Sequence, residues 1–248
     1  MVDAIILAGT SKPTELTVVE MVDNKAFIRI GEQTMLQYVY AALQRAAGIG
    51  RIAVVGPEAD LQACLEDQDV LIVQEGKTIM ENVERGFKAL QPTGYFLVCS
   101  ADIPFLTAEA VEDLLSACEP FTADFYYPIV ARSDNDKRFP GVRRTYVKLA
   151  DGEFTGGNLF LVNPACLGKA LPRLERLFAA RKSPLKLASL LGFAFIVKLF
   201  SRKLTIAELE KRFSELFAVA ARAVISRYPE IGTDVDKLSD LDLARRHL

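Results

Sequence analysis

The sequence predicts an α/β fold with three layers, in which helices cover both faces of a mixed, mainly parallel, Rossmann-like sheet. Two observations support this class. The first half of the chain alternates short apolar runs with segments whose apolar residues recur at helical spacing. The second half carries the signal of an antiparallel hairpin and then a long helical block. With 248 residues, 50% of them hydrophobic, the chain can bury a large core without disulfides.

The first half is expected to fold as alternating strands and helices. Strands of a parallel sheet are buried on both faces, so they read as short, continuous apolar runs. Thr34 and Thr107 stand where their hydroxyl groups would cap helices. The expected strands are residues 2–8, 51–56, 70–73 and 95–99, and the expected helices are residues 34–47, 58–65, 78–90 and 107–118.

The second half is expected to extend the sheet with antiparallel strands. Asp151 and Gly152 form a hairpin turn signal between two apolar segments. We expect a single domain over residues 1–248, with residues 164–220 as a helical insertion. The expected strands are residues 123–131, 142–150, 154–162 and 221–225, and the expected helical segments are residues 164–217 and 239–247.

The charge balance and the cysteine pattern exclude several classes of protein. The 30 basic and 32 acidic residues give a net charge of −2, which offers no basic excess for nucleic acid. The four cysteines are widely spaced and the lone histidine, His247, lies near the end of the chain, so no zinc site is expected. The first apolar run follows no basic segment and is too short for a signal peptide or a transmembrane helix. We therefore expect a cytoplasmic protein, monomeric or homodimeric, without a transmembrane segment.

The loop after the first strand is a candidate nucleotide-binding element. It contains Leu7, Ala8, Gly9, Thr10 and Lys12. A loop of small residues after a buried strand exposes backbone N–H groups, which can bind phosphates or the edge of a base. The loop matches neither GxxxxGK[ST] nor GxGxxG. The alternative is an ordinary turn between a strand and a helix.

Asp102, Lys25 and Asp236 are the candidate catalytic and metal-binding residues. Asp102 follows a buried strand, at the carboxyl edge of the predicted sheet, where ligands bind. Mg²⁺ takes one or two carboxylates at such a site together with substrate phosphates; the alternative is an Asp that caps a turn. Lys25 precedes an apolar strand, and on its own it reads as a surface lysine. Asp236 offers a second metal carboxylate, or else it caps the last helix.

Two further groups are candidates for binding an acceptor. Arg138, Arg143 and Arg144 surround a Phe-Pro-Gly turn, and three guanidinium groups suit a phosphorylated or acidic acceptor. The alternative is a solvated turn. Gly157 and Asn158 stand in a segment with two glycines, where a backbone can approach a ligand closely. The alternative there is a β-bulge.

The helical insertion contains a basic and apolar segment. Residues 176–207 include no acidic residue, and the apolar run at residues 187–197 is too short to span a bilayer. Three interpretations stay open: a core helix that covers the sheet, a dimer or partner surface, and a peripheral membrane contact through residues 181–203.

Taken in order, these motifs resemble the nucleotidyltransferase superfamily with a GT-A-like fold. The closest-looking branch is the MobA-like NTP transferases, a group of molybdenum-cofactor guanylyltransferase-like enzymes. No single motif carries the resemblance, which covers most of the chain except about residues 167–220. The matching positions are Leu7 to Gly9, Lys25 with Gly31, Met35 and Leu36, Asp102 with Pro104, Thr155 to Asn158, and Asp234 to Asp236 with Asp240 and Leu241.

The resemblance implies a Mg²⁺-dependent transfer of a nucleoside monophosphate from an NTP to a small, phosphorylated acceptor, with pyrophosphate release. In that reading Lys25 neutralises the α- and β-phosphates, and Asp102 and Asp236 bind Mg²⁺. Glu81 and Asn82 occupy the place where relatives line the base pocket, with an exposed helix face as the alternative. A molybdopterin is the default acceptor, and sugar, polyol or cofactor phosphates are the alternatives.

Two departures from the family pattern leave other functions open. The family loop reads Gly-Gly-x-Gly-x-Arg, whereas Gly9 is followed here by Thr10 and no arginine, which leaves Lys12 to supply the charge. Asn24 replaces the usual Pro or Asp before the lysine. The altered loop motivates a non-catalytic, nucleotide-binding regulatory module as one alternative. The DxD sequence at residues 234–236 motivates the other, a glycosyltransferase that uses a nucleotide sugar.

Overall fold

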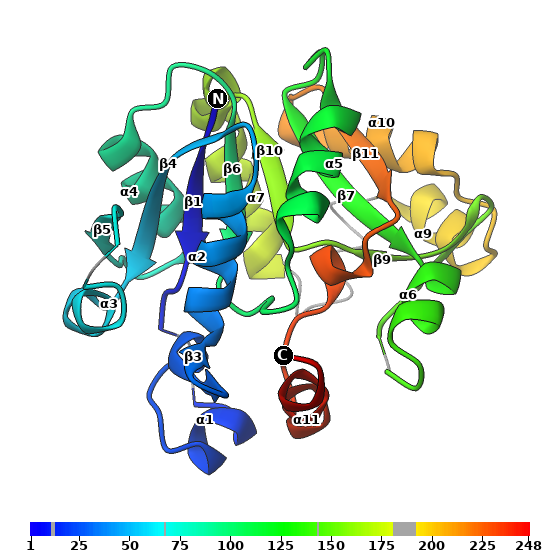
Figure 1. Cartoon of the computed structure of the whole chain (residues 1–248). Coiled ribbons are helices and arrows are strands. Elements are labelled where there is room, and N and C mark those ends of the chain that lie inside the picture. Colours follow the sequence, from blue (N-terminus) through cyan, green and yellow to red (C-terminus); the bar gives the residue numbers. More distant parts are fainter. Residues whose placement is uncertain (11–12, 67, 143, 181–191) are drawn as a thin grey trace.

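A mixed sheet of nine strands lies at the centre of the computed structural model, which describes residues 1–10, 13–66, 68–142, 144–180 and 192–248 (Figure 1). The strands are β1 (Val2–Leu7), β4 (Ile49–Gly56), β5 (Leu71–Gln74), β6 (Phe96–Ser100), β7 (Phe125–Ala131), β8 (Val147–Leu149), β9 (Gly152–Gly156), β10 (Leu159–Val162) and β11 (Ala221–Ser226). They follow the order β5-β4-β1-β6-β10-β7-β9-β8, and β11 pairs with β7. Strands β5, β4, β1 and β6 are parallel, whereas β10 is antiparallel to β6 and β7.

Helices cover both faces of this sheet because its strands carry apolar side chains on both sides. Along β1, Ala4 and Ile6 belong to one buried cluster, and Ile5 belongs to another on the opposite face. This arrangement confirms the predicted three-layer α/β class. The first cluster is completed by α2 (Met35–Arg45), α3 (Glu58–Cys64) and α5 (Ala108–Cys118), and the second by α4 (Ile79–Leu90), α7 (Leu167–Ala180) and α10 (Ile206–Phe217).

Threonine caps fix where α2, α4 and α5 begin. The side chains of Thr34, Thr78 and Thr107 each accept a hydrogen bond from the backbone N–H three residues later. Because β6 ends at Ser100 and α5 begins after Thr107, only a short turn joins them. That turn contains Asp102.

A separate group of short elements lies beyond the carboxyl ends of β1 and β4 (Figure 1). Its buried residues, Leu16 and Ile28 among them, form a third cluster. The strand predicted after Lys25 is shortened to Arg29–Ile30, because the Asn24 side chain accepts a hydrogen bond from the N–H of Ala26 and a 3₁₀ turn begins there. The elements of this group are α1 (Glu15–Val19), η1 (Lys25–Phe27), β2 (Arg29–Ile30), β3 (Gln33–Thr34) and α11 (Leu238–His247).

A two-residue bulge divides the strand predicted at residues 154–162 into β9 and β10. The pairing of β9 with β7 is offset by two residues from the pairing of β10 with β7. The extra residues are Gly157 and Asn158. The N–H of Asn158 donates to the carbonyl of Ile231, and its carbonyl accepts from the N–H of Ser100. The prediction of one continuous strand is therefore wrong. The bulge connects this segment by a hydrogen bond to the carboxyl end of β6.

The segment between β7 and β9 also differs from the prediction. Residues 132–138 form α6 (Arg132–Arg138), which the sequence analysis did not predict. The strand expected from residue 142 begins only at Val147, so Arg144 lies in an irregular segment. The predicted hairpin is confirmed, since β8 and β9 pair antiparallel around the turn at residues 150–151.

The helical insertion contains η2 (Pro164–Cys166), α7, α9 (Phe193–Phe200) and α10. Phe195 and Leu199 of α9 pack against a buried cluster that includes Phe154. Residues 181–191, the first part of the basic and apolar segment, lie outside the described residues. In the part of the chain that the structure covers, no helix is long and apolar enough to cross a membrane.

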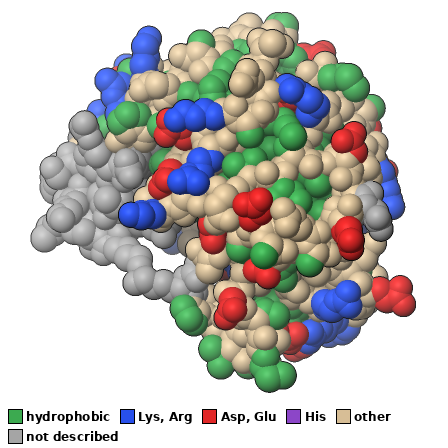
Figure 2. All heavy atoms as spheres, turned by 90° about the vertical axis from the view of Figure 1, so that its left-hand side faces the viewer, with side chains coloured by type: hydrophobic (Ala, Val, Ile, Leu, Met, Phe, Trp, Pro, Cys, Tyr) green, Lys and Arg blue, Asp and Glu red, His purple; other side chains and the backbone are tan. Residues whose placement is uncertain are grey.

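Acidic and basic side chains are interspersed on the face of the molecule at the β5 edge, and neither sign dominates it (Figure 2). On α4, Arg85 pairs with Glu81 and Lys88 pairs with Glu84. Such i,i+4 pairs keep opposite charges next to each other on an exposed helix surface. This pattern agrees with the small net charge of the chain.

The packing of α4 on the sheet can be tested at Gly86. A Cβ atom here would lie 2.7 Å from Cγ2 of Ile5 and 3.0 Å from Cγ2 of Val55, both in the core. We predict that Gly86→Val lowers the free energy of unfolding by about 1–3 kcal/mol through overpacking, measured by urea denaturation. Gly168→Val on α7 is the control, because no heavy atom lies within 4 Å of its Cβ position. An equal loss in both variants would contradict the explanation.

Candidate active site

Asp102 lies in the turn after β6, at the carboxyl edge of the sheet. The backbone of this turn is held at both sides: the N–H of Ala101 donates to the carbonyl of Leu7 (3.1 Å), and the carbonyl of Asp102 accepts from the N–H of Val235 (2.9 Å). The Asp102 side chain is 15% exposed. Its Oδ1 atom is buried and has no hydrogen-bond partner among the described residues. Because an unpartnered buried carboxylate oxygen is costly, this atom is suited to bind a cation.

Asp234 and Asp236 reach the same place from the other end of the sequence. They flank Val235, which is fully buried, in the extended segment between η3 (Pro229–Gly232) and α11. Alternate residues of an extended chain point to the same side, so burial of Val235 turns both carboxylates towards Asp102. One oxygen of each carboxylate lies within 4.8 Å of the others. Of these two aspartates, the sequence analysis assigned only Asp236 as a metal ligand. The apolar residue between them was the pattern that could have indicated Asp234 as well.

Lys25 is the first cation that faces this cluster. Its ammonium group forms ion pairs with Asp102 and with Asp236, the latter at 2.5 Å. Burial by itself lowers the pKa of Lys25, but the attraction of the two carboxylates outweighs it and holds this pKa above its ordinary value. The lysine is therefore charged throughout the neutral pH range.

Asn24 joins the lysine to the loop after β1. It is buried, and its Nδ2 donates to the carbonyl of Ala8 (2.7 Å) while its Oδ1 accepts from the N–H of Ala26 (2.9 Å). One side chain thus fixes both the end of the loop and the turn that carries Lys25. The sequence analysis recorded this asparagine only as a departure from the family pattern, and the structure gives it a positioning role.

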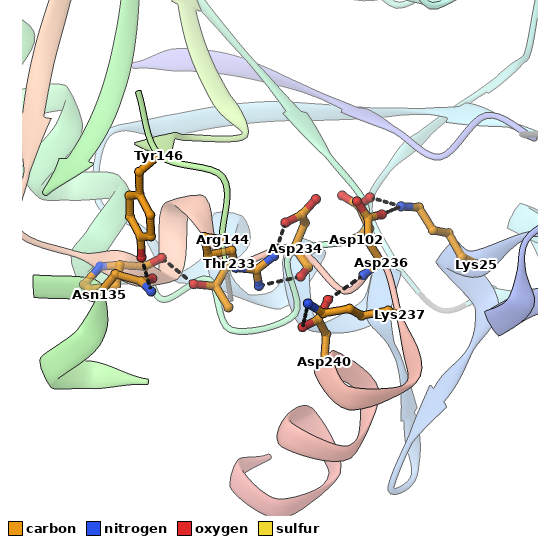
Figure 3. A network of polar contacts seen from close by, with 11 residues as sticks. Lys25, Asp102, Asn135, Arg144, Tyr146, Thr233, Asp234, Asp236, Lys237 and Asp240 are labelled. Atoms are coloured by element: carbon orange, nitrogen blue, oxygen red, sulfur yellow. Dashed lines mark hydrogen bonds and ion pairs between the residues drawn. The ribbon is translucent and has the colours of Figure 1, made fainter. Parts of the chain in front are cut away.

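Arg144 is the second cation of the cluster (Figure 3). Its Nη1 donates to Oδ1 of Asp234 (2.5 Å) and its Nη2 to the backbone carbonyl of the same residue (2.7 Å). The side chain is only 8% exposed, and its Nε has no hydrogen-bond partner in the described part of the chain. A buried guanidinium N–H without a partner is a donor available to an anionic ligand.

The three carboxylates outnumber these two cations. Burial raises the pKa of Asp234 to about 7, with repulsion from Asp236 in the same direction and Arg144 opposing it. Burial would also raise the pKa of Asp236, but the pairing with Lys25 outweighs burial and lowers it. Asp234 is therefore the carboxyl group that keeps a proton in slightly acidic solution, as expected where like charges share a site.

The loop after β1 contacts a carboxylate that the sequence analysis missed. Glu75, directly after β5, accepts hydrogen bonds from the backbone N–H (2.5 Å) and the hydroxyl (2.7 Å) of Thr10. Asn82 lies beside the same loop: a Cβ atom on Gly9 would lie 2.5 Å from its Nδ2. The close approach of α4 thus requires glycine at position 9. Nothing local in the sequence indicates the contact of Glu75 with Thr10, because 65 positions separate them.

Two cavities meet at the carboxylate cluster. The larger, with a volume of about 680 Å³, lies over the carboxyl ends of β1 and β6 and is called here the large cleft. The smaller, of about 380 Å³, lies between Arg144, the bulge and the start of α11 and is called the bulge pocket. Asp234, Asp236 and Asn158 line both cavities. A molecule in one cavity would therefore contact a molecule in the other at the carboxylates.

Most of the site residues expected from the sequence gather around these cavities. Glu81 and Arg138 line neither of them: Glu81 accepts from the N–H of Lys77, and Arg138, which is 55% exposed, pairs with Glu230 at 2.6 Å. Lys12 and Arg143 lie outside the described residues. The large cleft is lined by Leu7, Ala8, Gly9, Thr10, Lys25, Asn82, Asp102, Asn158 and Asp236, and the bulge pocket by Arg144, Gly157, Asn158 and Asp236.

The carboxylate cluster has the composition of a site for a hard divalent cation. Mg²⁺ and similar ions take oxygen ligands, and Asp102, Asp234 and Asp236 offer oxygens from three separate carboxylates. The buried, unpartnered Oδ1 of Asp102 fits the same role. The residues present therefore fit a metal ion.

Comparisons with known proteins identify the family and the fold of the chain. Residues 4–192 match a family model described as the MobA-like NTP transferase domain. A solved structure of a hypothetical transferase from Thermus thermophilus is 37% identical, with a TM-score of 0.86 over 97% of this chain and 99% of that one. No curated protein matches the sequence.

Two more distant structures share the fold. One is a CMP:2-keto-3-deoxy-manno-octonic acid synthetase complexed with CTP, which is 13% identical with a TM-score of 0.60 over 99% of this chain and 96% of that one. The other is a 4-diphosphocytidyl-2C-methyl-D-erythritol synthase from Anaerococcus prevotii, 15% identical with a TM-score of 0.57 over 99% of this chain and 95% of that one.

The link through Asn24 can be tested with an isosteric change. In Asn24→Asp the side chain can no longer donate to the carbonyl of Ala8, and a buried carboxylate faces that oxygen instead. We predict that the free energy of unfolding at neutral pH falls by about 1–3 kcal/mol, measured by urea denaturation. The exposed neighbour Asp23 provides the control: Asp23→Asn is expected to change stability by less than about 0.5 kcal/mol. Unchanged stability of Asn24→Asp would refute the positioning role.

Proposed function

The chain belongs to the family of MobA-like NTP transferase domains, and from this we propose that it transfers a nucleoside monophosphate from an NTP to a small anionic acceptor and releases pyrophosphate. The observation that supports this reaction is the meeting of the large cleft and the bulge pocket at one carboxylate cluster. A transfer between two substrates requires them to be held side by side at the reacting atoms.

We assign the NTP to the large cleft. The backbone of Leu7, Ala8 and Gly9 would face the base and the sugar, and Asn82 lines the same region of the cleft. The phosphates would then lie towards Lys25, whose charge compensates theirs. Because Asn24 fixes both the loop and the lysine, the two ends of a nucleotide would be held by one connected piece of backbone.

Asp102, Asp234 and Asp236 would hold Mg²⁺ at the inner end of the cleft. When bound, Mg²⁺ stabilises negative charge on the phosphate oxygens and on the leaving pyrophosphate. Lys25 would contribute a further positive charge from the opposite side of the cluster. In the reaction an acceptor oxygen attacks the α-phosphorus, a new P–O bond forms, and the bond to the pyrophosphate oxygen breaks.

We assign the acceptor to the bulge pocket. The unpartnered Nε of Arg144 is a buried donor that suits a phosphate or carboxylate group. Asn158 lines both cavities, so its side chain would lie between the two substrates. Gly157 lines the pocket with its backbone, and a Cβ atom here would lie 2.6 Å from Cγ2 of Ile231, so packing favours glycine at this position. We therefore propose a phosphorylated acceptor.

One observation supports an alternative, a nucleotide-binding regulatory module without catalysis. The carboxylate of Glu75 already occupies the N–H group of Thr10, which the loop would otherwise offer to a phosphate. An NTP would have to displace this carboxylate or bind beside it. The other alternative, a nucleotide-sugar glycosyltransferase, is disfavoured by the family match, which concerns NTP transferases.

The donor assignment predicts selective, metal-dependent binding of one NTP. In a thermal-shift screen with ATP, GTP, CTP and UTP, one nucleotide at about 100 times its Kd should add about 2.7 kcal/mol of stability in the presence of Mg²⁺. Asp102→Asn and Lys25→Met should lose this shift. Asp113→Asn, whose carboxylate pairs with the exposed Arg227 far from the cluster, is the matched control and should keep it.

With that NTP and a phosphorylated acceptor, Asp102→Asn should lower the rate of pyrophosphate release by about 10²–10³-fold. Binding of the NTP without any release of pyrophosphate would favour the regulatory module. The absence of a shift with all four nucleotides would overturn the donor assignment.

The raised pKa of Asp234 predicts how metal binding depends on pH. Its folded pKa of about 7 lies above the ordinary value of 3.8, so the carboxyl group is protonated below pH 7 and charged above it. A metal must displace this proton, and its affinity should therefore rise about tenfold from pH 6 to pH 8. Mn²⁺ titrations followed by electron paramagnetic resonance measure this. Asp234→Asn should bind more weakly and without the pH dependence; a flat profile in the unmodified protein would refute the assignment.

A further inference from the structure

A third cavity, of about 290 Å³, lies under the large cleft on the side of the sheet covered by α4, α7 and α10. Strands β1, β6, β7 and β10 form its floor. All of the side chains that line it are apolar or aromatic, and it is called here the apolar pocket. None of these residues was assigned to the site by the sequence analysis except Leu7.

The apolar pocket adjoins both substrate cavities. Leu7, Ile79, Val98 and Phe160 line the apolar pocket and the large cleft, and Tyr127 lines the apolar pocket and the bulge pocket. Asn158 of the bulge lines the two substrate cavities, where the substrates would meet. A ligand anchored at the bulge pocket can therefore extend into the apolar pocket past the ring of Tyr127.

Stacked aromatic rings build one wall of the apolar pocket. The rings of Tyr127 and Phe160 lie 5.4 Å apart and nearly parallel, at an interplanar angle of 9°. Phe125 stacks on Phe160 at 5.6 Å and on Phe213 of α10 at 5.6 Å. A wall of this kind is rigid and offers flat carbon surface, and the Tyr127 hydroxyl is the polar group of these rings.

We propose that the apolar pocket binds a hydrocarbon part of the acceptor and that the acceptor is therefore a phosphorylated amphiphile. This inference rests on the proposed function. Its phosphate group binds at Arg144 in the bulge pocket, and its carbon chain or ring lies against Tyr127 and Phe160. The apolar pocket is about twice the volume of an engineered 150 Å³ cavity that binds benzene, so it has room for roughly ten carbon atoms.

The chemistry of the walls excludes the polar parts of either substrate from this pocket. A nucleobase, a ribose or a phosphate would lose several hydrogen bonds to water there and find few partners on walls that are almost entirely carbon. An apolar cavity of this kind holds no stable water, so filling it with carbon is favourable. The hydrocarbon part of an amphiphilic acceptor needs no hydrogen-bond partner and would fill the apolar pocket with carbon, while its polar end stays in the bulge pocket.

A series of n-alkyl phosphates tests the proposal in the unmodified protein. Each buried CH₂ should tighten binding by up to about fourfold until the pocket is full, and we expect octyl phosphate to bind at least 100-fold more tightly than methyl phosphate by calorimetry. Octan-1-ol serves as the probe without a phosphate. It should bind much more weakly than octyl phosphate, because it lacks the group that Arg144 recognises.

A matched pair of variants on α7 locates the effect. Ala170 lines the apolar pocket and is buried, so Ala170→Leu should occupy part of it and reduce the gain from methyl to octyl phosphate. Gly168→Leu adds the same side chain two positions away, where no heavy atom lies within 4 Å, and should keep the gain. Thermal denaturation checks that both variants are folded. Both should also keep the Mg²⁺-dependent NTP shift, because neither residue lines the large cleft.

The outcomes separate this inference from the proposed function. Equal binding of methyl and octyl phosphate, or a gain that is undiminished in Ala170→Leu, would overturn the hydrocarbon site even if NTP binds as predicted. Equal affinity for octan-1-ol and octyl phosphate would show that the pocket acts apart from the phosphate site and would also overturn the inference. A clear chain-length effect without any NTP binding would instead overturn the proposed function.

Discussion

The repulsion among three neighbouring carboxylates is the constraint on which the rest of this site depends. Asp102, Asp234 and Asp236 place oxygens within 4.8 Å of one another, which is unfavourable without compensating charge. Lys25, which lines the large cleft, and Arg144, which lines the bulge pocket, compensate part of this negative charge. Burial, together with the repulsion from Asp236, raises the pKa of Asp234, and Oδ1 of Asp102 has no hydrogen-bond partner among the described residues. Both features favour a divalent cation, and the two proposed substrates would meet at this cluster.

The backbone places these groups through two local irregularities. The short turn between β6 and α5 presents Asp102 at the edge of the sheet, and the bulge after β9 presents Asn158 beside it. Both glycines before the asparagine are required by packing: a Cβ atom on Gly156 would lie 1.6 Å from the hydroxyl oxygen of Tyr127, and one on Gly157 would lie 2.9 Å from Cγ of Pro128. Asn158 of this bulge lines both the large cleft and the bulge pocket, so one irregularity shapes both.

The sequence analysis identified Asp102 because it follows a recognisable buried strand, whereas the role of Lys25 came only from the resemblance to a known family. It proposed both Glu81 and Asn82 as nucleotide-binding residues because they are adjacent in the sequence. Only Asn82 lines the large cleft. Asp234 lies in the same DxD sequence as Asp236, but its place in the cluster depends on the burial of Val235. Glu75 was missed because its partner, Thr10, is distant in sequence. When the role of a side chain depends on a partner that is distant in the sequence, the neighbouring residues in the sequence do not indicate that role.

The sequence by itself determined the type and order of most elements, because apolar periodicity and threonine caps are local properties of the chain. It also predicted a candidate site at the carboxyl ends of parallel strands. Only the tertiary structure decided that β9 and β10 are separated by a bulge, that Asn24 supports Lys25, and that three cavities of different polarity adjoin. Those features arise from contacts between segments far apart in sequence, and such contacts are set by the packing of the whole fold rather than by the preferences of any one segment.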